Sequence, residues 1–327
     1  MRDKLIQLLI QNLDTYISGE DISKVYGVTR AAIWKHIQLL KAQGCDIVCT
    51  PHRGYKLRSM PDSMRPEFIM AWLSTKYIGK EIRYFEKIDS TNNKARELAA
   101  SGCAQGLIVL ADEQDIGKGR MGRRWYSPVG VGIYFSVVLR PELHPSQAPQ
   151  ITVAAAVAAV RAIRVLTGID AQNKWPNDIV ADDKKIAGIM TEMSADMDRI
   201  NWMVVGIGVN VNNTWFPPEI AEHATSLKNI TGANFSRVQL LLTICHELED
   251  ILDVLIKKGN FQEILEEYES YSAIIAKRVR ITRKDSSTEG TVEGFDRDGA
   301  LLLKLDNGEI ERIVSGDVSL RGMNEYV

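Results

Sequence analysis

The chain has 327 residues, of which 45% are hydrophobic and 25% are charged, and its formal net charge is −2. This composition is typical of a globular protein with two or three domains and at least one large core, and it excludes a collagen-like or disordered chain. No apolar run approaches the ~20 residues that span a bilayer, and the N-terminus does not resemble a secretory signal. Four cysteines at irregular spacing favour reduced thiols, so we expect a cytoplasmic protein without a membrane partner.

The charge is distributed unevenly along the chain. Residues 1–65 hold ten basic and six acidic residues, a net charge of +4, whereas the remainder holds 30 basic and 36 acidic residues, a net charge of −6. A basic head on an acidic body indicates that the head contacts a polyanion.

The basic head begins with three predicted helices. Apolar residues at helical spacing predict the first over residues 5–13. Ser18, with Asp21 three residues later, is a typical start for the second helix, which Gly27 ends. Thr29 then caps a third helix over residues 30–43, whose buried face is Ile33, Ile37 and Leu40. A helix, a glycine turn and a second helix with a basic exposed face form the helix-turn-helix pattern.

A short hairpin is predicted after this helix, over residues 45–57, with Arg53 at its tip. Three helices followed by a basic hairpin resemble a winged-helix DNA-binding domain, and the alternative is a helical bundle for protein contacts. Trp34 could equally contact a neighbouring subunit. Cys45, Cys49 and His52 lack a fourth metal ligand, which favours small buried thiols. The candidate DNA-binding residues are Thr29, Arg30, Trp34, Lys35 and Arg53.

Residues 60–66, with two prolines, predict a linker to a central domain that contains the stretch Gly117–Trp125. In this stretch three glycines alternate with four basic residues between two predicted strands, residues 107–111 and 132–139. Such a loop can present backbone N–H groups and guanidinium groups to an anion. A solvated basic hairpin is the alternative.

Three further groups of residues in this domain indicate ligand binding. Ser90–Asn93 follow a predicted strand and precede a helix, where they could cap the helix or bind a ligand's carbonyl and N–H groups. Lys174–Asp178 form a proline turn in which Asn177 and Asp178 suit a nucleotide or its magnesium ion, and an Asx turn is the alternative. Glycines in the strands over residues 184–190 and 202–212 indicate either bulges or close approach of a ligand.

Together with Lys185–Gly188 and Gly206–Asn210, these motifs resemble the biotin protein ligase family. With the winged helix in front, the chain is similar to the bifunctional members that also repress the biotin operon. The resemblance implies a multidomain α+β protein whose central domain is a mixed, mostly antiparallel sheet with flanking helices, like class II synthetases. Alternating apolar residues after 277, with turns at 298–299 and 307–308, resemble the family's SH3-like C-terminal β-barrel. The domains expected are 1–63, 64–273 and 274–327.

The resemblance also implies a two-step reaction. Biotin and ATP, with Mg²⁺, form biotinyl-5′-AMP and pyrophosphate, and the biotinyl group then passes to a lysine of a biotin carrier domain. The matching catalytic residues are Arg120, Lys185 and Asp178, of which Asp178 is our candidate for taking the proton from the carrier lysine. The matching substrate-binding residues are Ser90, Thr91, Asn92, Gln114, Gly117, Lys118, Gly119, Arg120, Trp125, Lys185, Gly188, Gly206 and Gly208. The matching ATP-binding residues are Arg120, Arg123, Asn177 and Asn210, and no resident metal site is expected.

The partners implied are carrier domains of the acetyl-CoA carboxylase and pyruvate carboxylase type, operator DNA, and a second copy of the chain in the biotinyl-AMP-bound state. Two alternatives are a lipoate-type ligase and a regulator that senses a ligand without catalysis. Lys118 and Met121 depart from the family's usual basic residues, so we assign no role to either side chain.

Overall fold

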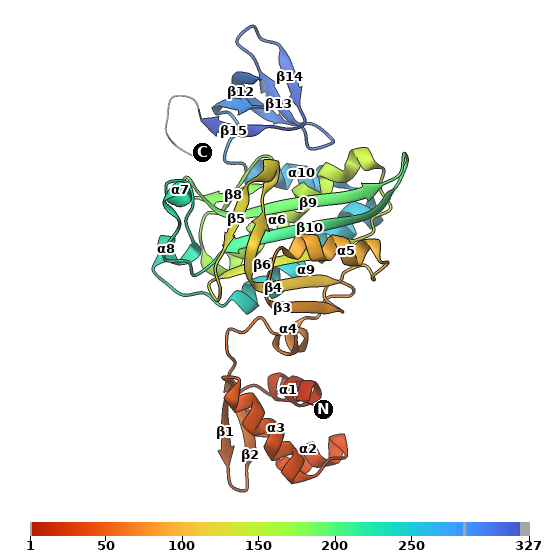
Figure 1. Ribbon diagram of the computed structural model, residues 1–327, viewed down its shortest axis with the longest axis vertical. Coiled ribbons are helices and arrows are strands. Elements are labelled where there is room, and N and C mark those ends of the chain that lie inside the picture. Colours follow the sequence, from red (N-terminus) through yellow and green to blue (C-terminus); the bar gives the residue numbers. More distant parts are fainter. Residues whose placement is uncertain (1, 284–285, 321–327) are drawn as a thin grey trace. The chain divides into compact units, whose positions relative to one another are not determined.

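The computed structural model describes residues 2–283 and 286–320, and its internal contacts divide the chain into two compact units, Met1–Ser74 and Thr75–Val327 (Figure 1). The first unit contains a helix-turn-helix and a hairpin, as predicted. Its elements are α1 (Arg2–Gln11), α2 (Gly19–Tyr26), α3 (Arg30–Ala42), β1 (Asp46–Thr50), β2 (Gly54–Ser59) and α4 (Pro66–Trp72).

The helix boundaries of the first unit follow the predicted caps. The Ser18 side chain accepts a hydrogen bond from the Asp21 N–H at the start of α2, and Gly27 ends that helix with φ +64°. Thr29 accepts from the Ala32 N–H at the start of α3. These local hydrogen bonds fix the turn between α2 and α3, and the core lies beneath them on Ile22, Ile33, Ile37 and Leu40.

Helix α4 belongs to this first unit. Its Phe68 is fully buried in the same core as Leu5 and Leu9 of α1, which explains why the structure divides after Ser74 whereas we placed the boundary after residue 63. The sequence pattern identifies the buried face of α4 but not the surface that covers it. The bounds 1–63, 64–273 and 274–327 remain a proposal, and residues 321–327 lie outside the described part of the chain.

An eight-stranded sheet forms the centre of the second unit. Seven strands follow the order β3-β4-β6-β10-β9-β8-β7, and β5 pairs with the far end of β4. Only β3 and β4 run parallel among the strand pairs of this sheet, so the sheet is mixed and mostly antiparallel, as predicted. The strands are β3 (Ile82–Ile88), β4 (Ile108–Lys118), β5 (Arg124–Ser127), β6 (Gly132–Leu139), β7 (Gln172–Lys174), β8 (Asp178–Ala181), β9 (Lys184–Ala195) and β10 (Ile200–Asn210).

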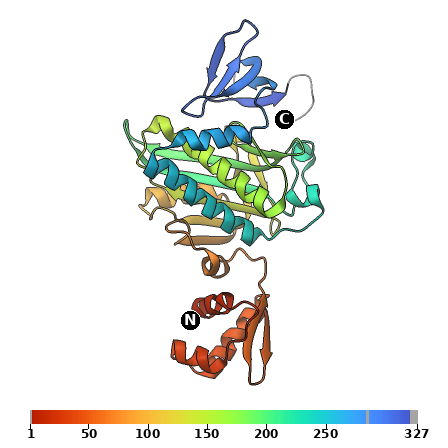
Figure 2. The same cartoon turned by 180° about the vertical axis from the view of Figure 1, so that it is seen from behind.

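Helices cover both faces of this sheet. Figure 2 shows α6, α9 and α10 packed together on one face, and Figure 1 shows α5 on the other. Short helices α7 and α8 follow β10. The bounds are α5 (Thr91–Ala100), α6 (Ala148–Thr167), α7 (Pro218–Ala221), α8 (Leu227–Thr231), α9 (Arg237–Lys258) and α10 (Phe261–Ser270).

The segment Pro145–Thr167 is the apolar core helix of this layer. By length and composition it could cross a bilayer, which corrects our statement that no apolar run approaches that length. However, 67% of its most apolar window is buried in the protein. Its apolar character is therefore accounted for by packing against the sheet and against α9.

The described part of the chain ends in an antiparallel sheet of order β14-β13-β12-β11-β15. The predicted turns at Gly299 and Gly308 have φ of +83° and +87°. The Trp175 indole N–H donates to the Gly299 carbonyl (3.1 Å), which ties this sheet to the turn between β7 and β8. An SH3-like barrel stays a prediction, because β14 and β15 are the outer strands in the described order. The strands are β11 (Arg278–Thr282), β12 (Ser287–Phe295), β13 (Leu301–Lys304), β14 (Ile310–Ile313) and β15 (Asp317–Leu320).

Candidate active site

One cavity of about 500 Å³ in the second unit collects almost all of the predicted ligand-binding residues. It lies over the ends of β4, β8, β9 and β10, and the C-terminal sheet contributes to its wall. The predicted residues that line it are Ser90, Thr91, Asn92, Gln114, Lys118, Gly119, Arg120, Arg123, Trp125, Asn177, Asp178, Lys185, Gly188, Gly206, Gly208 and Asn210. Gly117 is not among the lining residues. A side chain there would meet the Trp125 carbonyl at 2.5 Å, so Gly117 permits close packing of β4 and β5.

One end of the cavity is lined by neutral polar groups. The Thr91 N–H and hydroxyl donate to Gln114 Oε1 (2.8 and 3.1 Å), and Gln114 Nε2 donates to the Ser127 hydroxyl (2.9 Å). Ser90 precedes α5, but its side chain makes no capping hydrogen bond. Its hydroxyl is buried and has no hydrogen-bond partner in the described structure. The capping alternative is therefore wrong for Ser90, whose hydroxyl is free to bind a ligand.

The glycines of β9 and β10 allow close approach of side chains to the sheet. The register of the β9–β10 pair is regular from residue 202 to 209, so these glycines do not mark bulges. A Cβ on Gly208 would lie 2.5 Å from the Trp125 indole nitrogen, and one on Gly188 would lie 3.1 Å from the same ring. A Cβ on Gly206 would lie 1.9 Å from Asn92 Oδ1. Trp125 therefore lies directly against the floor of the cavity, as only glycine permits.

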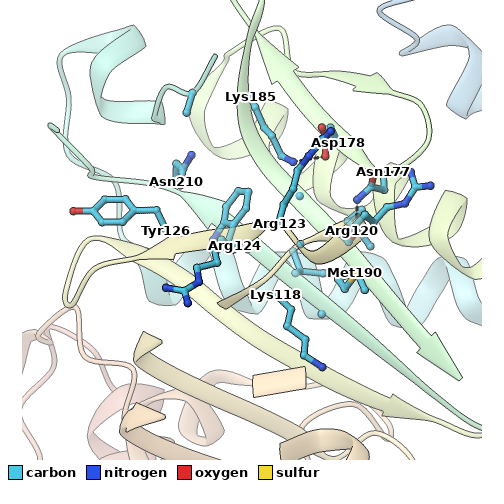
Figure 3. A pocket seen from close by; sticks show the side chains of 18 of the residues that line it. Lys118, Arg120, Arg123, Arg124, Tyr126, Asn177, Asp178, Lys185, Met190 and Asn210 are labelled. Atoms are coloured by element: carbon cyan, nitrogen blue, oxygen red, sulfur yellow. Dashed lines mark hydrogen bonds and ion pairs between the residues drawn. The ribbon is translucent and has the colours of Figure 1, made fainter. Parts of the chain in front are cut away.

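The other end of the cavity gathers cations. Lys185 Nζ lies 2.5 Å from Asp178 Oδ1, and Arg120 donates to Asn177 Oδ1 at 3.3 Å, as Figure 3 shows. The Asn177 amide in turn donates to the Ile189 carbonyl (2.6 Å), which fixes it between β8 and β9. Burial lowers the pKa of the Arg120 guanidinium, which still remains charged at neutral pH. The Lys174–Asp178 turn thus has a role in the cavity beyond that of an Asx turn.

Lys174 is a cavity residue to which our sequence reasoning gave no role. It is 4% exposed and lies opposite Asp178 across the β7–β8 pair. Burial lowers the pKa of its amine to about 8, with Asp178 acting in the opposite direction. Sequence alone marked this lysine as part of a motif, but its burial depends on the neighbouring strands and the C-terminal sheet.

The C-terminal sheet supplies an acidic residue to the cavity wall. Arg123 of the glycine–arginine loop donates to the carboxylate of Asp317 in β15. Asp317, Val318 and Ser319 all line the cavity. No local pattern predicts this contact, because 194 positions separate the two partners.

The remaining wall comes from the segment after β10 and was also missed. Phe216, Ile220 and Ala224 line it together with Tyr126 of β5, and they give it an apolar surface. The predicted residue Asn210 is buried and donates to the Thr225 carbonyl (3.0 Å), so its amide holds this segment in place. The Thr225 N–H donates to the Lys185 carbonyl (3.0 Å), which connects the segment to β9.

Neither of the two departures in the loop pairs with the residues of the cation end in the described structure. Lys118 Nζ lies 3.8 Å from Glu192, and Figure 3 shows this side chain extending away from the Lys185–Asp178 pair. Met121 is exposed and has φ +55°, in the left-handed region. Neither the Lys118 nor the Met121 side chain therefore takes the place of a guanidinium group beside Arg120 and Lys185.

The candidate DNA-binding residues lie on the surface of the first unit. Thr29, Arg30, Trp34 and Lys35 are exposed at the start of α3, and Arg53 is exposed at the hairpin tip. The Trp34 side chain is 58% exposed, which fits either a DNA or a protein contact. Cys45 is a buried thiol, as expected, and burial raises its pKa to about 11; Cys49 is exposed, so the prediction of a buried thiol is wrong for that residue. Within residues 2–283 and 286–320, no three His, Cys, Asp or Glu residues gather in a way that could hold a metal ion.

The chain, which combines a helix-turn-helix unit with a cation-lined cavity, is similar to known proteins over 98% of its length. Residues 84–210 match the biotin/lipoate A/B protein ligase family, residues 2–56 match an HTH domain, and residues 274–321 match the biotin protein ligase C-terminal domain. The chain belongs to the biotin protein ligase family.

Curated relatives share both units. The chain is 37% identical over 322 residues to the bifunctional ligase/repressor BirA of Bacillus spizizenii, covering 98% of each protein. It is 30% identical to the BirA of Escherichia coli, covering 97% of this chain and 96% of that protein. The structure of the biotin protein ligase of Aquifex aeolicus in complex with biotin and ATP superposes with a TM-score of 0.64 at 31% identity, covering 74% of this chain and 99% of the other.

Proposed function

We propose that this protein is an ATP-dependent biotin protein ligase that forms biotinyl-5′-AMP, transfers biotin to a lysine of a carrier domain, and acts as a repressor when it holds biotinyl-5′-AMP. The observation that carries this proposal is the polarity of the cavity. A neutral, hydrogen-bonding end at Ser90, Thr91 and Gln114 suits the ureido ring of biotin, and a cationic end at Arg120 and Lys185 suits a carboxylate that meets a phosphate.

In the first step an oxygen of the biotin carboxylate attacks the α-phosphorus of ATP. A new P–O bond forms, and the bond to pyrophosphate breaks. Two anions must approach each other, so Arg120 and Lys185 lower the barrier by neutralising both. Before ligand enters, Asp178 pairs with Lys185 at 2.5 Å, which offsets the cost of holding that ammonium group in a partly buried site.

In the second step the amine of the carrier lysine attacks the acyl carbon of biotinyl-5′-AMP. The amide C–N bond forms, the acyl C–O bond breaks, and AMP leaves with the bonding electrons. The attacking nitrogen must lose a proton, and we propose that Asp178, which pairs with Lys185, receives it. Trp125 over the glycine floor would exclude water from the reactive anhydride.

Mg²⁺ is proposed to enter with ATP and to neutralise phosphate charge. Asp178, Asp317 and the amide oxygen of Asn177 are the lining groups that could complete its coordination. We assign no chemical step to the ion.

The first unit supports the proposed regulatory role. In a dimer, two helix-turn-helix units would contact two half-sites of an operator, and occupancy of the cavity by biotinyl-5′-AMP would favour that dimer. We further propose a class II synthetase-like catalytic fold, an SH3-like C-terminal domain, carrier domains of the acetyl-CoA carboxylase and pyruvate carboxylase type as substrates, and a cytoplasmic location.

Pyrophosphate exchange into ATP tests the proposal. Exchange that requires biotin, followed by transfer to a carrier domain, supports it. Exchange that requires lipoate would assign the cavity to a related acyl ligase. No exchange with either acid, in a protein that still binds biotin, would identify a regulator without catalysis.

A further inference from the structure

Tyr16 lies beside the tip end of the hairpin in the first unit, outside every helix and strand. The guanidinium carbon of Arg53 lies 4.2 Å from the centroid of its ring, and Lys56 Nζ lies 5.5 Å from the same centroid. Arg53 is at the hairpin tip, where its side chain is exposed. One aromatic ring thus contacts two of the cations of the hairpin.

The Tyr16 ring is itself held firmly against the hairpin. Its hydroxyl lies 2.9 Å from the hydroxyl of Thr50, the last residue of β1. On the main chain, Ile17 and Tyr55 exchange two hydrogen bonds of 2.9 Å, and a Cβ on Gly54 would lie 2.0 Å from the Ile17 carbonyl. The segment that contains Tyr16 is therefore paired to β2, and its hydroxyl contact with Thr50 holds the ring beside the hairpin.

Arg53, Lys56 and Arg30 differ in whether an acidic side chain pairs with them. Lys56 lies 3.4 Å from Asp14, and Arg30 lies 3.1 Å from Glu20. Arg53 forms no ion pair within the described residues, so the ring orients its guanidinium without neutralising the charge. A stacked guanidinium keeps N–H donors at its rim for a second partner. That arrangement leaves Arg53 oriented and available to bind an anion.

We propose that Tyr16 is a positioning residue for DNA binding, which holds the Arg53 guanidinium at the hairpin tip ready to contact the DNA backbone. This inference rests on the proposed DNA-binding function of the first unit. Orientation before binding reduces the entropy lost when the side chain is immobilised on a phosphate. Prior orientation of one long side chain contributes on the order of a threefold to fivefold gain in affinity.

A double-mutant cycle in the full-length protein tests the proposal. The probe is a mixed-sequence duplex of roughly 40 base pairs, titrated at several salt concentrations, because phosphate contacts dominate such binding. Tyr16→Leu should weaken binding about threefold to fivefold. Arg53→Ala should weaken it at least as much and lower the salt slope by about one. The double variant should bind no more weakly than Arg53→Ala alone, because Tyr16 acts through Arg53.

Two further variants separate positioning from a general structural role. Tyr16→Phe keeps the aromatic face and should bind within about twofold of the wild type. Arg53→Lys keeps the charge at an exposed position but loses the flat stack, and it should weaken binding in the wild type and not in Tyr16→Leu. If Tyr16→Leu unfolds, Arg53→Lys is instead introduced into Tyr16→Phe. The loss of DNA affinity caused by Arg53→Lys should be as large in Tyr16→Phe as in the wild type, because both keep the aromatic ring. Carrier biotinylation should be unchanged in all of these variants.

Equal losses from Tyr16→Leu with and without Arg53 would overturn the inference, as would wild-type affinity in Tyr16→Leu. Failure of the DNA-binding function itself would look different. In that case the wild type would show no salt-dependent binding, and Lys35→Ala on the exposed face of α3 would have no effect.

Discussion

The two units of this protein hold their basic residues in opposite ways. In the first unit the cations of α3 and of the hairpin tip are exposed, and Arg53 stacks on an aromatic ring. In the cavity of the second unit, Lys185 is partly buried against Asp178, and Lys174 is almost fully buried. Exposed cations suit a polyanion that arrives as a surface, whereas enclosed cations suit a small anion that must be separated from water.

This difference has consequences for the size of mutational effects. An enclosed charge acts in a medium of low polarity, where removing it changes the energy of a reaction strongly. An exposed charge is screened by salt and contributes modestly, as one of many. The following predictions test this contrast, beginning with the largest effect.

Removing a cavity cation should nearly abolish the first reaction step. Arg120→Ala or Lys185→Ala should lower biotin-dependent pyrophosphate exchange about 100-fold to 1,000-fold, because each neutralises developing charge. Salt-dependent binding to a mixed-sequence duplex should not change. The matched control is Lys184→Ala, since Lys184 is exposed and absent from the cavity lining. A comparable loss in the control would mean that general charge, and not the enclosed position, matters.

Adding a methyl group to a glycine in the floor of the cavity should lower both the stability of the protein and its affinity for biotin. In Gly206→Ala the new methyl group would meet Asn92 Oδ1 at 1.9 Å, and Asn92 also lies 2.7 Å from the Ser136 hydroxyl. We expect a loss of about 1–3 kcal/mol in the free energy of unfolding, and weaker biotin binding. Urea unfolding and isothermal titration with biotin measure the two effects.

Gly19→Ala provides the comparison in the first unit. Its methyl group would lie 3.4 Å from Tyr55, an ordinary contact, at the start of α2. We expect little change in stability, and a loss as large as that of Gly206→Ala would contradict the role assigned to the floor.

The buried amine of Lys174 should make ATP binding depend on pH. Its pKa is lowered to about 8, so the amine is charged below this pH and neutral above it. Because phosphate attracts the charged form, affinity for ATP should fall as pH rises from 7 to 9, by roughly threefold to tenfold. Lys174→Arg stays charged and should flatten this profile, whereas Lys184→Arg should leave it unchanged. A steep fall retained in Lys174→Arg would assign the titration to another group.

A single exposed cation of the first unit should have the smallest effect. Lys35→Ala should weaken duplex binding about threefold and lower the salt slope by about one, because one cation is removed from the exposed face of α3. Biotin-dependent exchange should be unaffected, since Lys35 lies outside the unit that contains the cavity. Matching losses in both assays would refute the division of roles between the two units.

The local features of the chain were determined by sequence alone. Ser18, Thr29 and Gly27 set the helix ends of the first unit because capping depends on residues a few positions apart. The longer strands β3, β4, β6, β9 and β10 and the glycine–arginine loop were likewise predicted, because periodicity and turn residues act locally, whereas the short strands β5, β7 and β8 were not predicted. The motifs of the loop, the proline turn and the two glycine strands also identified most of one cavity.

Tertiary structure decided what those motifs contact. The pairing of Arg123 with Asp317, the burial of Lys174 and the packing of Phe68 into the first unit each depend on residues far away in the chain. The sequence shows the glycines of β10 but not why they are needed. They are needed because the Trp125 ring and the Asn92 amide lie directly against the sheet. A sequence pattern records which side chains avoid water, whereas only the folded chain fixes which surface covers them and therefore which charges are enclosed.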